Sequence, residues 1–333
     1  MKSVFIFLIL IFYADDLKSQ LNIDSLNIVD YHVHIFSEGL IHNLEAQGYN
    51  MANSGFQIIN ESASDYSNLD KILKDNSSFK MVLISTSYAY KQLDTINWMN
   101  EKEFLQLEND LLAKLIQKQP KKLLGFYGIN PLKGYALNEI KRCHEELKLH
   151  GLKLHFQGNH VDLNNEDHLQ KVKAILSYAS KEKIPVLIHN NAWNIEDGQN
   201  YANTFIAQVL EEIDSLTIIF AHAGGGGGFF KFTKDFLSTF DEYFKTADAS
   251  RNHNIYFELS GVIKLRQFSG SQDLKELEVL MENIGFDRFI FGSDYPVKNA
   301  SVYIKTIMNK LNLRPNILKA IIERDIFQKS KRN

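Results

Sequence analysis

The sequence predicts an α/β fold, a (β/α)8 TIM barrel with an insertion after its first strand. Short apolar runs rich in β-branched residues alternate with helical patterns, which is typical of parallel βα units. Eight such units occur within 333 residues, the size of one barrel with insertions. Histidine, lysine and aspartate recur where the apolar runs end, and barrel enzymes carry their active sites at those strand ends. An open doubly wound sheet is the alternative, but no Gly-x-Gly-x-x-Gly follows the first run.

Eight apolar runs are predicted to be the strands. The third run stops at Asn130-Pro131 and the eighth at Tyr295-Pro296, since proline cannot donate a ladder hydrogen bond. The sixth leads into five consecutive glycines, which permit close approach of the backbone. In order, the predicted strands are residues 26–35, 81–87, 124–129, 151–156, 185–189, 216–222, 254–260 and 288–294.

Helical periodicity separates these strands. Within residues 136–149, for example, apolar side chains and one histidine recur at the spacing of a helix face. The region 36–80 is instead long and polar, with a helical patch at 69–73, and is predicted to be an insertion over one end of the fold. The predicted helices are residues 96–118, 136–149, 168–183, 204–213, a Phe-rich segment after the glycines at 224–228, then 273–284, 302–311 and 316–326.

Composition excludes several classes of protein. The formal net charge of −3 leaves no broad basic surface, so a nucleic-acid partner is not expected. No apolar run reaches 18 residues, so we expect no membrane span. Cys143 is the only cysteine, which excludes an internal disulfide and a multi-cysteine metal site. The expected partner is therefore a small-molecule substrate, and a homo-oligomer is compatible with the composition.

The N-terminal segment has the features of a secretory signal. Lys2 precedes a short apolar run over residues 4–13, and Ser19 can stand at the last position before cleavage. We therefore predict a signal peptide at 1–19, a single barrel domain at 20–333, and an exported protein, periplasmic or secreted. The alternative is that the segment packs on the barrel of a cytoplasmic protein.

Two histidines stand at the end of the first strand. Successive side chains of a strand point to opposite faces, so Asp30, His32 and His34 are expected to share one face. Two imidazoles on one face can reach one cation, and imidazole suits zinc and similar metals. Asp30 lies two residues deeper and is expected to orient an imidazole rather than to bind the metal itself. The alternative is a half-buried strand whose histidines are merely hydrogen-bonded.

Titratable side chains stand at four further strand ends. They are Lys153 and His155 at the fourth, His189 at the fifth, His222 at the sixth and Asp294 at the eighth. A catalytic zinc takes three or four protein ligands and keeps one position for water. Four residues meet that requirement, namely His32, His34, His189 and Asp294.

These motifs together resemble the amidohydrolase superfamily, in its amidohydrolase-related (amidohydrolase-2) branch. In order, they are Asp30-x-His32-x-His34, Gly151-Leu152-Lys153-Leu154-His155, Ile188-His189, Ala221-His222-x-Gly-Gly and Phe291-Gly292-Ser293-Asp294-Tyr295-Pro296. The branch comprises metal-dependent hydrolases, lactonases and non-oxidative decarboxylases on a (β/α)8 barrel.

The resemblance implies one divalent metal ion as cofactor, usually zinc and sometimes manganese. Its ligands would be His32, His34 and His189, and Asp294 would be a ligand, the general base, or both in turn. His222 resembles the family histidine that polarises the substrate carbonyl or assists proton transfer. In other branches a lysine at the place of Lys153 is carboxylated and bridges two metals. The alternative is a contact to substrate or to a ligand, which is also the role expected of His155.

Three functions remain open. Hydrolysis of an ester, lactone or amide bond of a small molecule is the leading interpretation. Non-oxidative decarboxylation of a small carboxylic acid is the alternative. Decarboxylases commonly clamp the carboxylate with an arginine, and here Arg251 and Arg266 only flank the seventh strand. A non-catalytic exported binding protein is the third, and it would be expected to lack a ligand.

Overall fold

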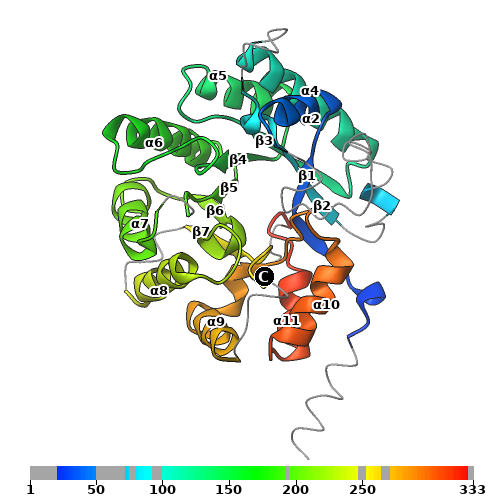
Figure 1. Ribbon diagram of the computed structural model, residues 1–333, viewed down its shortest axis with the longest axis vertical. Coiled ribbons are helices and arrows are strands. Elements are labelled where there is room, and N and C mark those ends of the chain that lie inside the picture. The colour runs from blue at the N-terminus through cyan, green and yellow to red at the C-terminus, as the bar shows by residue number, and fades with distance from the viewer. Residues whose placement is uncertain are drawn as a thin grey trace, which may run out of the picture.

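Eight parallel strands form a single sheet whose order follows the chain (Figure 1). The computed structural model describes residues 21–49, 72–74, 80–91, 100–192, 195–246, 253–263 and 271–328. The strands are β1 (Val29–Ile35), β2 (Lys80–Ser85), β3 (Leu123–Gly128), β4 (Gly151–His155), β5 (Val186–His189), β6 (Thr217–Phe220), β7 (Asn254–Glu258) and β8 (Phe289–Ile290). The predicted succession of parallel βα units is confirmed.

The barrel closes where the segment around β8 meets β1. The amide of Tyr31 donates to the carbonyl of Phe291 at 3.1 Å, and the amide of His34 donates to the carbonyl of Tyr295 at 2.8 Å. In return, the amide of Tyr295 donates to the carbonyl of His32 at 3.1 Å. These bonds join the first strand to the last, so the predicted TIM barrel is confirmed.

Helices surround the strands (Figure 1). In α4 (Glu101–Lys118), the Asn100 side chain accepts from the amide of Glu103, and the buried face includes Leu105 and Leu112. A capped start and one apolar face are what a helix packed on a sheet requires. The other helices are α2 (Glu38–Ala46), α5 (Ala136–Lys141), α6 (Glu166–Lys181), α7 (Gly198–Phe205), α8 (Lys231–Lys245), α9 (Ser271–Ile284), α10 (Ala300–Lys310) and α11 (Pro315–Ile322).

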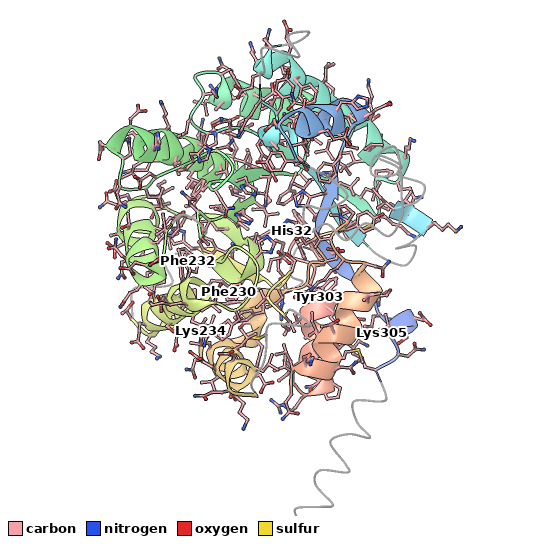
Figure 2. The ribbon with its side chains drawn as sticks, in the orientation of Figure 1. His32, Phe230, Phe232, Lys234, Tyr303 and Lys305 are labelled. Carbon is pink, nitrogen blue, oxygen red and sulfur yellow. The ribbon has the colours of Figure 1, made fainter. Side chains whose placement is uncertain are left out.

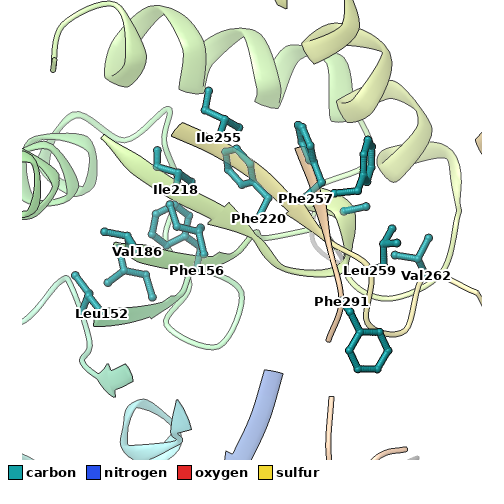
Figure 3. Close-up of a cluster of buried hydrophobic side chains, with 14 of the residues drawn as sticks. Leu152, Phe156, Val186, Ile218, Phe220, Ile255, Phe257, Leu259, Val262 and Phe291 are labelled. Carbon is teal, nitrogen blue, oxygen red and sulfur yellow. The ribbon is translucent and has the colours of Figure 1, made fainter. Parts of the chain in front are cut away.

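Apolar side chains pack in two layers, one on each side of the sheet. The inner cluster consists of strand residues and Ala221, with Ile326 and Phe327 packed against them, and it fills the barrel interior. The outer cluster lies between strands and helices, where the ring centroid of Phe220 on β6 is 5.9 Å from that of Phe257 on β7 (Figure 3). Each fully buried phenylalanine contributes roughly 2–3 kcal/mol of transfer free energy. This packing holds the strand ends in fixed positions.

The strand β1 is irregular between Asp30 and Val33, where its register against β2 shifts. Before the shift, Tyr31 belongs to the inner cluster, and after it Val33 belongs to the outer cluster. In a regular strand these two side chains would share a face, so the shift reverses the alternation. The prediction that Asp30 shares a face with His32 and His34 is therefore wrong.

The other strand predictions agree to within three residues, except at the end of β8. This strand ends at Ile290, four residues earlier than expected, and β6 ends two residues early, at Phe220. In both places a later residue adopts left-handed backbone geometry, with φ of 53° at His222 and 62° at Asp294. This conformation is incompatible with an extended strand.

Several predictions concern residues outside the described ranges. They include the signal peptide at 1–19, most of the insertion at 36–80, the start of the helix at 96–118, and both Arg251 and Arg266. Within the insertion, α2 is described, and so is a helical piece at 72–74 that overlaps the predicted patch. Among the described helices, none is long and apolar enough to cross a membrane.

Candidate metal centre

Three potential ligand atoms meet at the junction of β1 and β8. Nε2 of His32 lies 3.1 Å from Nε2 of His34 and 3.5 Å from Oδ1 of Asp294. Nε2 of His34 lies 3.3 Å from the same oxygen. Figure 2 shows His32 near the middle of the ring of helices. The His32 side chain is fully buried, whereas 11% of the His34 side chain and 19% of the Asp294 side chain are exposed, so the group reaches solvent at these two residues.

These distances fit a divalent metal ion. Ligand atoms at about 2.0–2.1 Å from a tetrahedral zinc lie about 3.3 Å from one another. Two imidazole nitrogens and one carboxylate oxygen are also donors that zinc and manganese accept. The lone pairs of the two ring nitrogens and the carboxylate oxygen lie close together and repel one another. A cation between them would offset this repulsion. The three residues therefore fit the metal that the sequence motifs imply.

The ligand atoms of His32, His34 and Asp294 form a triangle, and each imidazole of this triangle is held by its other ring nitrogen. Nδ1 of His32 lies 2.9 Å from Oε2 of Glu258, and Nδ1 of His34 lies 3.1 Å from Oγ1 of Thr86. A partner on Nδ1 leaves Nε2 as the ligand atom and fixes the ring orientation. Burial lowers the pKa of His32 well below its ordinary value, and the neighbouring Lys153 lowers it further. His32 is therefore neutral at physiological pH, as metal ligation requires.

The local hydrogen bonds of Asp30 differ from those expected. Its Oδ1 accepts from the backbone amides of His32 at 3.0 Å and Ser293 at 2.9 Å, while its Oδ2 is buried without a hydrogen-bond partner. The prediction that Asp30 orients an imidazole is therefore wrong. Because β1 shifts register here, the carboxylate instead ties the irregular part of β1 to the segment that leads to Asp294.

His189 lies beside this triangle, on the side of β5. Its ring stacks on His155 with 4.1 Å between ring centroids, and its centroid is 4.9 Å from that of His222. Nδ1 of His189 donates to the carbonyl of Asn190 at 2.9 Å, because a carbonyl can only accept, so Nε2 carries the free electron pair. Burial lowers its pKa well below the ordinary value. Its predicted role as a further ligand stays a prediction.

His222 presents the same tautomer from the end of β6. Its Nδ1 lies 2.8 Å from the carbonyl oxygen of Ser260, which fixes the proton on Nδ1 and leaves Nε2 free to accept. Its ring centroid is 5.1 Å from that of His32. Burial lowers the pKa of His222, and the nearby Asp294 carboxylate opposes that change. A neutral imidazole with an unprotonated Nε2 is a candidate general base.

Glu258, the last residue of β7, belongs to the centre but was missed in the sequence analysis. It is fully buried, contacts His32 as described, and forms a second potential ligand group with His32 and His222. Burial raises its pKa to about 8, and hydrogen bonds from Ser260 oppose that rise. Its position at the end of the seventh strand could have identified it, because the other residues of the centre also stand at strand ends. Glutamate was not among the residue types sought at those ends.

Lys153 and His155 project from the same face of β4. Nζ of Lys153 is buried with no hydrogen-bond partner, and burial lowers its pKa to about 8 while Asp294 and Glu258 oppose this. Nδ1 of His155 accepts from the amide of Gly158 at 2.8 Å, so a neutral His155 carries its proton on Nε2. Its tautomer is thus opposite to that of His222, and it can donate a hydrogen bond where His222 accepts one.

Comparison with solved structures finds the same barrel. A 5-carboxyvanillate decarboxylase of Novosphingobium aromaticivorans with bound manganese is 15% identical over 90% of this chain and 95% of its own, with a TM-score of 0.59. A 2,6-dihydroxybenzoate decarboxylase from Rhizobium is 16% identical over 90% and 96%, with a TM-score of 0.56. A probable 2-pyrone-4,6-dicarboxylic acid hydrolase from Acinetobacter baumannii is 17% identical over 88% and 96%, with a TM-score of 0.51.

The family comparison covers most of the barrel. The model of the family described as Amidohydrolase (Amidohydro_2) matches residues 29–309, from the start of β1 into the last turn of α10. That range contains the strand-end histidines, Glu258 and Asp294, so the match includes every element of the candidate centre. The resemblance read from the sequence motifs is thereby confirmed, and the chain belongs to the amidohydrolase-2 family of metal-dependent enzymes.

Proposed function

We propose that this protein is a metal-dependent hydrolase that cleaves an ester, lactone or amide bond of a small molecule. One observation carries the proposal: His32, His34 and Asp294 bring three ligand atoms within 3.5 Å of one another, and the neutral His222 stands beside them with Nε2 free. This combination supplies ligands for one ion and a separate base, which are the parts that hydrolysis of a carbonyl compound requires.

Each side chain of the centre has its own role in the proposed reaction. When bound, a divalent ion, zinc or manganese, supplies an activated water and an electrophile for a carbonyl oxygen. His32 and His34 would hold the ion, with His189 as the proposed third imidazole. Asp294 can ligate through one oxygen and accept a proton at the other, and it can return that proton to the leaving group. His222 accepts a hydrogen bond or a proton at Nε2.

Decarboxylation remains the second candidate, for a specific reason. The buried ammonium of Lys153 has no hydrogen-bond partner, and His155 can donate from Nε2. Lys153 could neutralise a substrate carboxylate and His155 could donate a hydrogen bond to it, in place of an arginine. Of the three solved structures compared above, two are decarboxylases and one is described as a hydrolase, so the shared barrel accommodates both reactions.

The test starts with the purified protein. Its metal content is measured, the metal is removed with a chelator, and activity is assayed before and after adding back zinc or manganese. The substrate panel contains esters, lactones and amides, and separately hydroxylated aromatic carboxylic acids. We expect metal-dependent acid release from the first group. Carbon dioxide release from the second group would assign the lyase instead, and a folded protein that binds no metal would contradict both.

We also propose export, on the basis of the N-terminal segment alone. The mass of the mature chain recovered from separated cell fractions tests this. Recovery of a chain that still begins at Met1 in the cytoplasmic fraction would contradict it.

A further inference from the structure

The end of β7 brings two fully buried polar side chains under the candidate centre. Glu258 is the last residue of the strand, and Ser260 follows two positions later. Tyr303 of α10 holds the residue between them, because its hydroxyl donates to the carbonyl of Leu259 at 2.5 Å (Figure 2). The same hydroxyl accepts from the amide of Ile263 at 3.2 Å. The segment is thus fixed from outside the barrel.

The carboxylate of Glu258 is surrounded by donors. Its Oε2 lies 2.7 Å from the hydroxyl of Ser260, 2.9 Å from Nδ1 of His32 and 3.4 Å from the backbone amide of His222. Its Oε1 accepts from the amide of Ser260. Burial favours the protonated acid, whereas four donors around two oxygens favour the carboxylate. In this donor geometry Glu258 accepts from His32, which keeps its proton on Nδ1.

Ser260 links this carboxylate to the second histidine. Its hydroxyl proton goes to Glu258, so its oxygen is left to accept from Nδ1 of His222 at 3.0 Å and from Nδ1 of His32 at 3.2 Å. Its backbone carbonyl accepts from Nδ1 of His222 at 2.8 Å. One short segment of β7 therefore faces the Nδ1 atoms of a potential metal ligand and of the potential base.

We propose that Glu258 and Ser260 act as a positioning pair that holds the protons of His32 and His222 on Nδ1 and so presents both Nε2 atoms to the centre. Metal affinity then depends on Glu258 through His32, and the basicity of His222 depends on Ser260. The proposal rests on the proposed function only for the part that His222 plays in the reaction. The tautomers and the metal affinity can be measured without any substrate.

Glu258 could alternatively be a metal ligand itself, together with His32 and His222. In that case an ion would replace the Nδ1 protons of His32 and His222. The His32–His34–Asp294 triangle would hold a second ion, so the chain would have two metal sites. The stoichiometry of metal binding separates the two arrangements. One ion per chain agrees with the positioning pair, and two ions in the wild type against one in the Glu258 variant would overturn it.

The variants are Glu258→Gln and Ser260→Ala, with Glu139→Gln as the matched control. A glutamine must place its NH2 group against existing donors, whichever way it is turned, so it cannot replace the carboxylate. Glu139 is also buried and accepts from Asn109 and Arg142, but none of its hydrogen-bond partners belongs to the centre. Circular dichroism establishes whether each variant is folded. If Glu258→Gln does not fold, Ser260→Ala, which is the smaller change, is used to test the proposal.

Two measurements decide the proposal. Competition with a chromophoric chelator gives the affinity for Zn²⁺ alone, which we expect to fall about 10- to 100-fold in Glu258→Gln and to stay unchanged in Glu139→Gln. Long-range ¹H–¹⁵N spectra give each histidine tautomer, and we expect the Nδ1–H form of His32 to lose population in Glu258→Gln. In Ser260→Ala, His222 should keep its proton on Nδ1, because the backbone carbonyl of residue 260 remains, but its pKa should change. Wild-type affinity together with wild-type tautomers in both variants would overturn the proposal. If the tautomers and affinity change as expected but no substrate is hydrolysed, only the proposed function fails.

Discussion

Nε2 of His34 lies 3.3 Å from Oδ1 of Asp294, and this pair stands at the seam where the last strand of the barrel meets the first. Backbone hydrogen bonds between His34 and Tyr295, and between Tyr295 and His32, form the same seam. A metal ion held by these side chains would therefore also cross-link the closure of the barrel. The centre and the fold should depend on one another energetically.

Metal binding should raise the stability of the folded protein. An ion whose free concentration is 100 times its dissociation constant adds about 2.7 kcal/mol to the free energy of unfolding. We expect added Zn²⁺ to raise the melting temperature of the apoprotein and to have little effect on Asp294→Ala. Thermal scans with and without Zn²⁺ measure this, with the exposed Asp167→Asn as a control that keeps the full shift. An equal shift in Asp294→Ala would show that the ion binds elsewhere.

His222→Asn should separate metal binding from catalysis. His222 lies outside the triangle of closest ligand atoms, so its loss should leave the metal content unchanged. Loss of a general base lowers rates about 10²- to 10⁴-fold, and we expect kcat to fall within that range. Metal analysis and steady-state kinetics on the substrate found in the panel check both parts. The exposed His42→Asn should behave as wild type. A metal-free His222→Asn protein would identify His222 as a ligand instead.

Glu108 on α4 should make stability fall as the pH rises. The carboxyl is buried, accepts from the hydroxyl of Ser37, and burial raises its pKa from 4.5 to about 7. The folded state thus keeps a proton that the unfolded state releases, and the free energy of unfolding decreases between about pH 4.5 and 7, by up to about 3 kcal/mol. Below pH 4.5 both states are protonated and the contribution is complete.

Glu108→Gln cannot ionise, so we expect it to be more stable than the wild type at pH 8 and less dependent on pH. Urea denaturation at pH 5 and pH 8 measures both quantities. Glu103→Gln, an exposed change on the same helix, is the matched control and should follow the wild type. If Glu108→Gln shows the full wild-type pH dependence, another group carries it.

The regular part of the barrel follows from local sequence. Alternating apolar runs and helical periodicity locate the strands and helices, and the strand-end rule brings His32, His34 and Asp294 to one place, as observed. These features depend on near neighbours in the chain or on the topology of parallel units. They are therefore readable without coordinates.

The irregular backbone of β1 does not follow from the sequence. Asp30, whose role was predicted wrongly, lies in this part of the strand. The register shift in β1 goes with its pairing to β2 and with a hydrogen bond from the amide of Ser293 to Asp30, a contact between residues 263 positions apart. The partner of His32 likewise comes from β7, through Glu258. Long-range contacts of this kind leave no local pattern, so the orienting role went to the wrong carboxylate.

Gly292 should be required for the place that Glu258 occupies. A Cβ atom at this position would lie 2.0 Å from Oε1 of Glu258 and 2.9 Å from Cβ of His32, closer than packed atoms allow. Gly292→Ala must therefore displace the carboxylate or the backbone, and such overpacking costs typically about 1–3 kcal/mol. We expect a lower melting temperature and weaker Zn²⁺ binding together, because the displaced group is the partner of a metal ligand. Gly134→Ala is the matched control, since its Cβ meets no atom within 4 Å and should change neither quantity. Wild-type Zn²⁺ affinity in a destabilised Gly292→Ala protein would show that the centre tolerates movement of Glu258, and would count against its positioning role.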